Sequence, residues 1–464
     1  MSKSDPLFLE ELHRVSKIFK SLVKEKKVKM IYHLDADGIT SASIILKMLL
    51  REGADFEMTM AKQLTSKSVE NLKIEKGDVL ILADLGSGQL DLLKDILEKT
   101  QILILDHHES TRLDNINLFH LNPLRYGEEE ITSSIICYLF AKAVNLENVD
   151  LIDLAIVGAV GDELDEKWEF KGFTKKILEE AENVGKLTIS RGIRLYGRNK
   201  KPIHKSLEHS FDPLIPGITG SESNAVQFLS EIGIKIKKDD GWKRLADLDI
   251  EEQQKLASAI IVERLKANHL DAADIFGEIY TILGRPEELQ DAREFATLLN
   301  ACGRLQRQDV GIRLCLGDLT AIEESKEVLN QYRKAMSESI NWIRENKESI
   351  LKTNLATYIL GSDKVPDTMI GTITSIFLNS NLVDVKKPVF GFAETEGGMV
   401  KVSARASRDI KINLRNVILN ATKQLHAEGG GHMHAAGALI SKDKEKEFID
   451  IVDNTVGEMI GKES

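Results

Sequence analysis

Short apolar runs alternate with amphipathic segments over the first 190 residues. The runs are long enough for strands that are apolar on both faces, and they cover residues 28–34, 78–84, 101–105 and 118–121. The segments between and around them have the periodicity or length of helices, at residues 6–27, 40–51, 90–99, 132–144 and 151–162. Strands of this kind that alternate with helices are typical of a parallel sheet covered on both sides. This part of the chain therefore predicts an α/β domain.

The pattern changes after residue 190. The next part is more polar, and its periodicity predicts helices near 222–232, 252–267, 287–302 and 320–348. The last part again alternates, with short strands expected at 355–360, 389–393, 400–404 and 437–441 and helices at 369–379, 413–426 and 444–460. We therefore expect a parallel-sheet domain over 1–190, a mostly helical middle region over 191–350 and a smaller α/β domain over 351–464.

Acidic and histidine side chains follow the predicted strands where each strand ends. They are His33, Asp35 and Asp37 after the first strand, Asp84 after the second, and Asp106, His107 and His108 after the third, with Asp162 at a helix end. Because the carboxyl ends of parallel strands share one edge of a sheet, we expect these side chains to converge. The alternative is that each one only caps a strand or forms a turn. Recurrence at separate places favours a common site.

The chemistry of this set points to divalent cations. Several carboxylates at short range cannot all stay ionised without a cation. Carboxylate with imidazole suits Mn²⁺ or Mg²⁺, and the only cysteines, Cys137, Cys302 and Cys315, have no spacing for a thiolate site or a disulfide framework. The ligands suffice for two ions roughly 3.5–4 Å apart, the spacing used for in-line phosphoryl displacement. The sequence therefore predicts a two-metal site for phosphate ester chemistry.

Composition and charge narrow the class of protein. The chain has 464 residues, 42% hydrophobic and 29% charged, which is typical of a soluble protein with two or three domains. No apolar run approaches the ~20 residues that span a bilayer, and the first residues lack a signal-peptide core, so we expect a cytoplasmic protein without membrane contact. The net charge of −11 leaves room for a local basic track along a nucleic acid. Basic residues at 191–205 could form it, with a solvated loop as the alternative.

The ordered set of motifs resembles the DHH phosphoesterase superfamily. The resemblance rests on His33-x-Asp-x-Asp-Gly38, Asp84, Asp106-His-His108 and Gly158-x-x-x-Asp162. The run Gly430-Gly-His-Met-His-Ala-Ala-Gly437 resembles the signature of the DHH-associated carboxyl-terminal domain. Leu299-Asn-Ala-Cys-Gly-Arg304 resembles a segment of RecJ exonucleases that usually has Ala in place of Cys302, and the loop 212–220 is similar to the archaeal RecJ-like branch, whose members include GINS-associated nucleases.

This resemblance implies a role for each residue. His33 and Asp35 would hold one metal ion, which Asp84 would bridge to a second. Asp37, His107 and Asp162 would hold that second ion. Asp106 would orient an imidazole, and His108 would contact a phosphoryl oxygen or assist the leaving group. The residues implied to bind substrate are Asn300, Arg304, Ser403, Arg405, Gly429, Gly430, Gly431 and His432. A flexible turn for the glycines and a surface ion pair for Arg304 remain the alternatives.

The resemblance also implies an activity. It implies a metal-dependent exonuclease that hydrolyses single-stranded DNA or RNA to nucleoside monophosphates in replication or repair, in partnership with the GINS complex. One alternative is a phosphodiesterase for short oligonucleotides or cyclic dinucleotides, which the large middle region disfavours. Another is a replication scaffold like one eukaryotic helicase subunit that has lost catalysis, which the complete ligand set disfavours. The sequence indicates neither the polarity of digestion nor a preference between DNA and RNA.

Overall fold

The computed structural model describes residues 5–65, 69–70, 73–129, 131–165, 169–210, 213–239, 241–267, 272–378, 383–395, 397–407 and 410–461. Asp212, at the start of the loop 212–220, lies outside these ranges. The chain forms two compact units. The first comprises residues 1–192 and 276–330, and the second comprises 193–275 and 331–464. Both units therefore draw on the middle region of the sequence.

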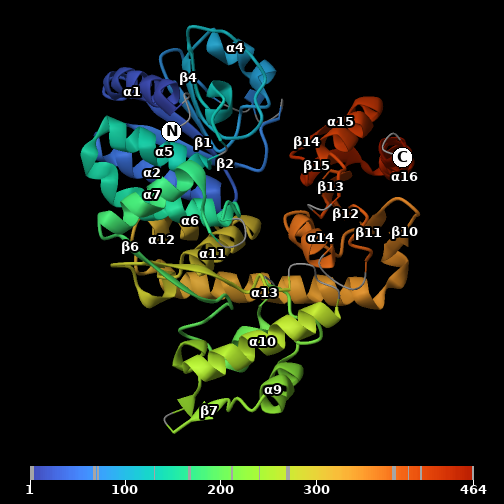
Figure 1. The fold of residues 1–464 in the computed structure, drawn as a ribbon. Coiled ribbons are helices and arrows are strands. Elements are labelled where there is room, and N and C mark those ends of the chain that lie inside the picture. Colours follow the sequence, from blue (N-terminus) through green and yellow to red (C-terminus); the bar gives the residue numbers. More distant parts are fainter. Residues whose placement is uncertain are drawn as a thin grey trace. The chain divides into compact units, whose positions relative to one another are not determined.

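A five-stranded parallel sheet forms the centre of the first unit (Figure 1). Its strands, in the order β2-β1-β3-β4-β5, are β1 (Val28–His33), β2 (Phe56–Ala61), β3 (Val79–Ala83), β4 (Gln101–Leu105) and β5 (Leu118–Leu121). The parallel sheet and the α/β class are as predicted. The apolar runs predict every strand except β2, which alternates between half-buried and exposed residues at the edge of the sheet.

Helices pack around this sheet and against one another. They are α1 (Asp5–Leu22), α2 (Ala36–Arg51), α4 (Lys94–Leu97), α5 (Ser133–Val144), α6 (Ile152–Gly161) and α7 (Gly172–Asn183). The predicted start of the second helix near Thr40 is wrong, because Asp35 accepts a hydrogen bond from Gly38 N and caps α2 one turn earlier. The predicted helix 90–99 is instead a 3₁₀ helix, Leu90–Leu93, followed by the short α4.

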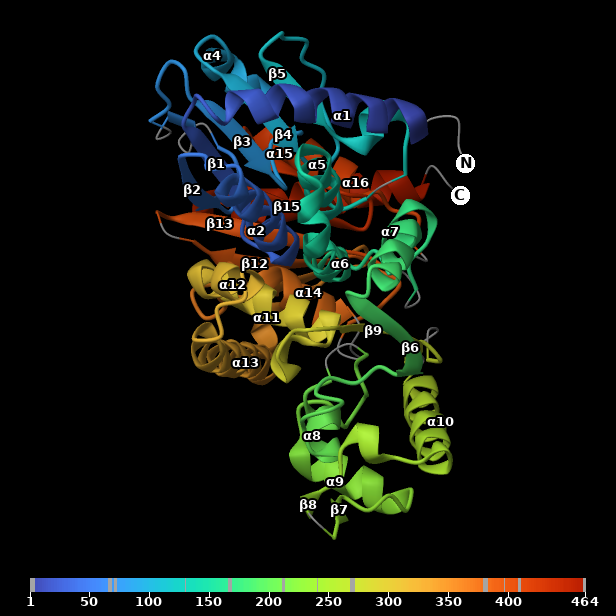
Figure 2. The ribbon, with the colours of Figure 1, turned by 90° about the vertical axis from the view of Figure 1, so that its left-hand side faces the viewer.

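Residues 276–330 also belong to the first unit. Strand β9 (Phe276–Ile282) pairs with β6 (Leu187–Ile193), and α11 (Ala292–Arg304) packs on α2 and α6, with α12 (Gln308–Cys315) also on α2 (Figure 2). Helix α13 (Ala321–Glu345) begins in this unit. The periodicity predicts only helices here, because the β6–β9 pairing joins segments that are distant in the sequence.

The second unit contains a helical part and a mixed six-stranded sheet. The helical part has α8 (Ile203–Glu208), α9 (Glu222–Glu231), α10 (Ile250–Lys266) and the short strands β7 (Lys237–Lys238) and β8 (Gly241–Trp242). The sheet has the order β10-β11-β12-β13-β15-β14. Its strands are β10 (Ile350–Lys352), β11 (Thr357–Leu360), β12 (Val389–Glu394), β13 (Met399–Arg405), β14 (Glu428–Gly431) and β15 (Ala435–Ser441). The accompanying helices are α14 (Ile370–Leu378), α15 (Leu414–Leu425) and α16 (Glu445–Gly461).

The glycine run forms the edge strand β14 and pairs antiparallel with β15. This differs from the flexible turn that was the alternative interpretation of the run. None of the described helices combines the length and the apolar composition that crossing a membrane requires.

Candidate metal centre

The carboxyl edge of the five-stranded sheet brings the predicted ligands together. Three sets of side chains each have ligand atoms that all lie within 4.8 Å of one another. The sets are His33, Asp35 and Asp84; Asp37, His107 and Asp162; and Asp84, His107 and His108. Because Asp84 and His107 each belong to two sets, the described groups form one continuous cluster, which we call the ligand cluster.

Helix ends place the two carboxylates that follow β1. Asp35 caps α2, and Asp37 lies in the first turn of the same helix. The Asp37 carboxylate accepts hydrogen bonds from Ser133 N at 2.8 Å and Ser134 N at 3.0 Å, at the start of α5. Gly38 permits the tight turn, because a Cβ at this position would lie 2.6 Å from the carbonyl carbon of the last residue of β1. The Asp-x-Asp-Gly spacing thus fixes both carboxylates at the N-terminus of α2, and Asp37 also lies at the N-terminus of α5.

Asp84 occupies the most constrained position in the cluster. Its φ of 63° lies in the left-handed region, and its side chain is buried. Its Oδ2 lies 3.4 Å from His33 Nδ1, and its Oδ1 lies 3.6 Å from His107 Nε2. No described residue donates a hydrogen bond to Oδ1. A buried carboxylate oxygen without a donor is costly unless a cation approaches it, so this atom fits a metal ligand.

Burial and mutual repulsion shift the pKa values of the cluster. Burial, followed by the charges of Asp37 and Asp35, raises the pKa of Asp84 well above its ordinary value. Burial also raises the pKa of Asp162 to about 7 and raises that of Asp37. Burial opposes a charge on His33, yet the adjacent Asp35 carboxylate raises its pKa. Without a cation, the cluster therefore retains protons that a bound metal would displace.

Asp106 lies beside the cluster and orients His108. Its Oδ1 accepts hydrogen bonds from His107 N at 2.8 Å and from His108 Nδ1 at 2.7 Å. Its Oδ2 accepts a hydrogen bond from Ser87 N at 2.9 Å. Burial opposes ionisation of Asp106, but the charge of His108 and these donors lower its pKa well below the ordinary value. Because Nδ1 of His108 donates its hydrogen bond to Asp106, the other ring nitrogen, Nε2, points away from that carboxylate.

Two of the predicted substrate-binding residues, Asn300 and Arg304, lie on α11 in the same unit. The Oδ1 of Asn300 accepts a hydrogen bond at 3.0 Å from the main-chain N of Ala36, between the two ligand carboxylates of the turn. Gly303 faces the same turn, and a Cβ there would lie 2.8 Å from the carbonyl carbon of Leu34. The segment Asn300–Arg304 thus packs directly on the turn that carries the carboxylates, which the sequence did not reveal. Its contact with substrate stays a prediction.

The other predicted substrate-binding residues lie in the second unit. Ser403 and Arg405 belong to β13, and Arg405 Nη1 and Ser403 Oγ form a hydrogen bond of 3.2 Å. Ser403 pairs with Gly437 of β15, which pairs in turn with Gly430 of β14. Strand β15 therefore lies between the glycine run and Ser403. His432 follows the run, and its N donates a hydrogen bond to the carbonyl oxygen of Ala435 at 2.8 Å.

Helix α14 adds residues that sequence reasoning missed. Ser375 Oγ accepts a hydrogen bond from Arg405 Nε at 3.1 Å. A Cβ at Gly371 would lie 3.1 Å from Ser403 Oγ, so a small residue is favoured there. The signal for this contact was the succession of small residues near the start of the predicted helix 369–379.

Two lysines of the basic run at 191–205 contact other side chains of the second unit. Lys205 Nζ pairs with Glu222 at 2.7 Å. Lys201 Nζ and the Arg333 guanidinium lie 5.1 Å and 4.5 Å from the centre of the Tyr196 ring. The ion pair offsets the charge of Lys205, and the ring contact holds the Lys201 side chain beside Tyr196.

Protein-family models match three parts of the chain. The DHH family, N-terminal domain matches residues 27–159, the DHH-CID domain matches residues 195–275, and the DHHA1 domain matches residues 354–458. An uncharacterized protein of Methanocaldococcus jannaschii is 34% identical over 470 residues, which cover 97% of this chain and 99% of that protein.

Two solved structures share the fold over nearly the whole chain. CDC45 from Entamoeba histolytica has a TM-score of 0.66 at 12% identity, covering 97% of this chain and 99% of that one. RecJ in complex with Mn²⁺ from Thermus thermophilus has a TM-score of 0.60 at 17% identity, covering 97% of this chain and 55% of that one. This chain therefore spans about half the length of that RecJ. At these identities the likeness shows a common fold.

Proposed function

Because this chain is a RecJ-like member of the DHH superfamily of phosphoesterases, we propose that it is a metal-dependent exonuclease for single-stranded DNA or RNA. The observation that carries the proposal is the continuity of the ligand cluster, in which Asp84 and His107 each join two sets of ligands. The Mn²⁺ in the RecJ structure supports Mn²⁺, or Mg²⁺ with similar ligand preferences, as the cofactor.

We propose that the cluster holds two ions. His33 and Asp35 would hold one, and Asp37, His107 and Asp162 would hold the other, with Asp84 between them. Two bound ions would lower the pKa of a water molecule and stabilise the charge that develops on the phosphoryl group. The role of Asp106 is to hold His108 through Nδ1, so that Nε2 would face a phosphoryl oxygen or the leaving group.

The second unit would bind the substrate. The Arg405 guanidinium, supported by Ser403 and Ser375, has the donors for a phosphate group. The glycine strand Gly429–Gly431 with His432 would let main-chain N–H groups approach the terminal nucleotide. We propose that the products are nucleoside monophosphates released from one end of a strand, in DNA replication or repair.

Digestion of end-labelled single strands tests the proposal. With Mn²⁺ we expect stepwise release of mononucleotides from one end, and none when a chelator is added. Asp84→Asn should abolish the release in Mn²⁺. Comparison of a dinucleotide with a long strand separates an exonuclease from an oligonucleotide phosphodiesterase. Intact DNA and RNA strands after incubation of the wild-type protein with each divalent ion would contradict the proposal.

A second candidate function is a scaffold in a replication complex. The fold likeness to CDC45 extends over 99% of that chain and favours this candidate. Binding to the GINS complex would be the expected contact, and a pull-down with recombinant GINS would test it. The complete ligand cluster still favours an enzyme, and the two functions are compatible in one protein.

A further inference from the structure

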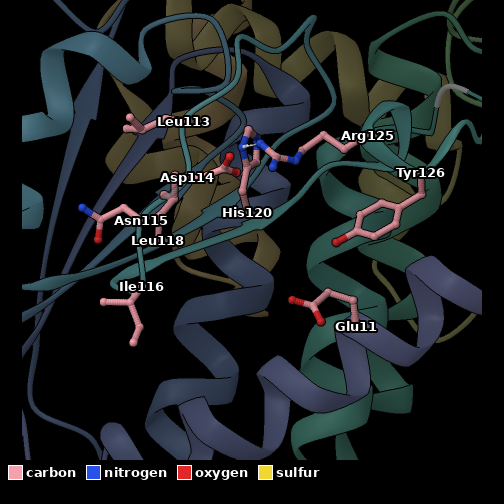
Figure 3. Close-up of a pocket in the computed structure, with 9 residues that line it drawn as sticks. All are labelled: Glu11, Leu113, Asp114, Asn115, Ile116, Leu118, His120, Arg125 and Tyr126. Carbon is pink, nitrogen blue, oxygen red and sulfur yellow. Dashed lines mark hydrogen bonds between the residues drawn. The ribbon is translucent and has the colours of Figure 1, made fainter.

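A chain of hydrogen bonds runs within the first unit from the surface to Asp106. Arg125 Nη1 lies 2.9 Å from His120 Nδ1, and His120 Nε2 lies 2.8 Å from Ser87 Oγ (Figure 3 shows the first of these pairs). The main-chain N of Ser87 then donates to Asp106 Oδ2 at 2.9 Å. His120, Ser87 and Asp106 are all buried. The carboxylate that orients His108 is thus linked to an arginine at the surface.

The direction of these hydrogen bonds follows from chemistry. Burial, together with the charge of Arg125, lowers the pKa of His120 to about 4, so its ring is neutral at pH 7. A guanidinium only donates, so His120 Nδ1 accepts from Arg125. The ring proton is therefore on Nε2, which donates to Ser87 Oγ. Arg125 in this way selects the tautomer of His120 that can donate a hydrogen bond to Ser87 Oγ.

Asn122 forms a second branch of the same network. Its Nδ2 donates to Ser87 Oγ at 3.0 Å and to the carbonyl oxygen of His108 at 2.7 Å. Its Oδ1 accepts a hydrogen bond from Leu124 N at 3.0 Å. Asn122 is buried, so loss of this side chain would leave several buried polar groups without these partners. The main chain of His108 is thereby tied to the same hydroxyl group that His120 contacts.

We propose that Ser87, His120 and Asn122 are positioning residues for the Asp106–His108 segment. The inference rests on the proposed function, because it concerns the role of His108 in phosphodiester hydrolysis. Asp106 binds the His108 ring through one oxygen and Ser87 through the other, so a displacement of Ser87 rotates the carboxylate and the ring together. None of the three positioning residues belongs to the described ligand sets, so they act through Asp106 and the His108 main chain.

The outer end of the network can be changed without disturbing the core. Arg125 is exposed and lines a hollow of about 490 Å³ with Glu11, Asp114 and Tyr126 (Figure 3). Arg125→Ala removes the donor that selects the His120 tautomer but leaves the ligand cluster intact. Arg112→Ala, at an exposed arginine of the same unit outside the network, is the matched control. Tyr138→Phe, which removes a hydrogen bond to Glu180, controls for the loss of one buried polar contact.

The experiment measures kcat and KM on a labelled single strand with Mn²⁺. Arg125→Ala, Ser87→Ala and His120→Leu should each lower kcat by about 10- to 100-fold, the usual cost of losing such a supporting partner, with KM nearly unchanged. His120→Gln should recover most of the activity, because its amide can still donate to Ser87 and accept from Arg125. Both control variants should keep the wild-type kcat.

Imidazole nitrogen spectra give a readout that does not depend on activity. The wild-type spectrum should show His120 protonated on Nε2, and Arg125→Ala should shift the balance toward the other tautomer. An active wild-type protein with unchanged kcat in Arg125→Ala and Ser87→Ala would overturn the inference, as would a rise in KM alone. If the wild-type protein showed no hydrolysis, the proposed function would be rejected instead. If His120 were protonated on Nδ1 in the wild-type protein, the hydrogen-bond network would be wrong whatever the activity.

Discussion

Gly303 offers a direct test of how α11 supports the ligand cluster. In the Gly303→Ala variant the new Cβ would lie 2.8 Å from the carbonyl carbon of Leu34 and closer still to its oxygen. Non-bonded carbon atoms prefer a separation of roughly 3.5–4.0 Å. Because the carbonyl oxygen is the closer atom, either α11 or the turn after β1 must move by more than about 1 Å. Because that turn carries Asp35 and Asp37, the displacement reaches two of the proposed metal ligands directly.

The expected loss of activity is accompanied by a loss of stability. Overpacking costs about 1–3 kcal/mol of unfolding free energy and occasionally more, and the obstructing atoms here are backbone, so the cost lies at the upper end of this range or above it. The better helix propensity of Ala offsets roughly 1 kcal/mol. A displacement of about 1 Å in a catalytic site lowers the rate by about 100-fold. We therefore expect a variant that folds with a lower melting temperature, a kcat reduced about 100-fold or more, and weaker binding of Mn²⁺.

The assay combines hydrolysis of a labelled single strand, calorimetric titration with Mn²⁺ and thermal unfolding. Gly311→Ala on α12 is the matched control, because the nearest atoms to its new Cβ are side-chain carbons of Ile39 and Leu299, each at 3.3 Å. These flexible side chains can give way, so this variant should keep its activity. Wild-type kcat and Mn²⁺ affinity in Gly303→Ala would refute the reasoning. Equal losses in both variants would show that the effect is not specific to the turn.

Three further predictions concern the cluster itself. Asp84→Asn should lower hydrolysis to the level of the chelator control, yet raise the melting temperature in chelator, because the buried carboxyl group must take up a proton on folding when no metal is bound, whereas the amide need not, and Asn tolerates the left-handed backbone. Mn²⁺ binding should release protons and weaken as the pH falls through about 7, because Asp162, with its pKa raised to about 7, is protonated below that pH; calorimetry in buffers of different ionisation enthalpy measures this. Asn300→Ala should cost about 1 kcal/mol in chemical denaturation and weaken Mn²⁺ binding, since Ala36 N loses its acceptor.

Each of these predictions has an outcome that would count against it. Substantial turnover in Asp84→Asn would remove this carboxylate from the metal site. Mn²⁺ binding with the same heat in every buffer would show that the cluster holds no displaceable protons near neutral pH. Unchanged Mn²⁺ affinity in Asn300→Ala would limit that residue to the substrate contact that the sequence suggested.

Much of the fold was visible in the sequence because buried parallel strands are apolar on both faces. That signal predicts β1, β3, β4 and β5 within about one residue. It fails for β2, where exposed polar residues alternate with partly buried ones, and for the β6–β9 pair, whose strands come from separate parts of the chain. The early start of α2 depends on the capping contact of Asp35, and an apolar pattern does not reveal such a contact.

The convergence of the ligand residues was predictable for a geometric reason. Parallel strands end at one edge, so residues that follow β1, β3 and β4 lie close together whatever the loops do. The supporting contacts do not follow from this rule. The hydrogen bond from Ala36 to Asn300 and the network through Ser87 and His120 join segments with no common period or motif. Only the tertiary packing determines them.

The first unit is built from two separate stretches of the chain, 1–192 and 276–330, and this affects its assembly during biosynthesis. On the ribosome, the turn that carries Asp35 and Asp37 emerges long before Asn300 and Gly303, which pack on it. At typical elongation rates the delay is on the order of tens of seconds. During that interval the nascent chain exposes an acidic, incompletely covered turn, and the entire helical part at 193–275 is made before the covering helix arrives. Completion of the sheet edge that carries the ligand cluster therefore requires translation past residue 304.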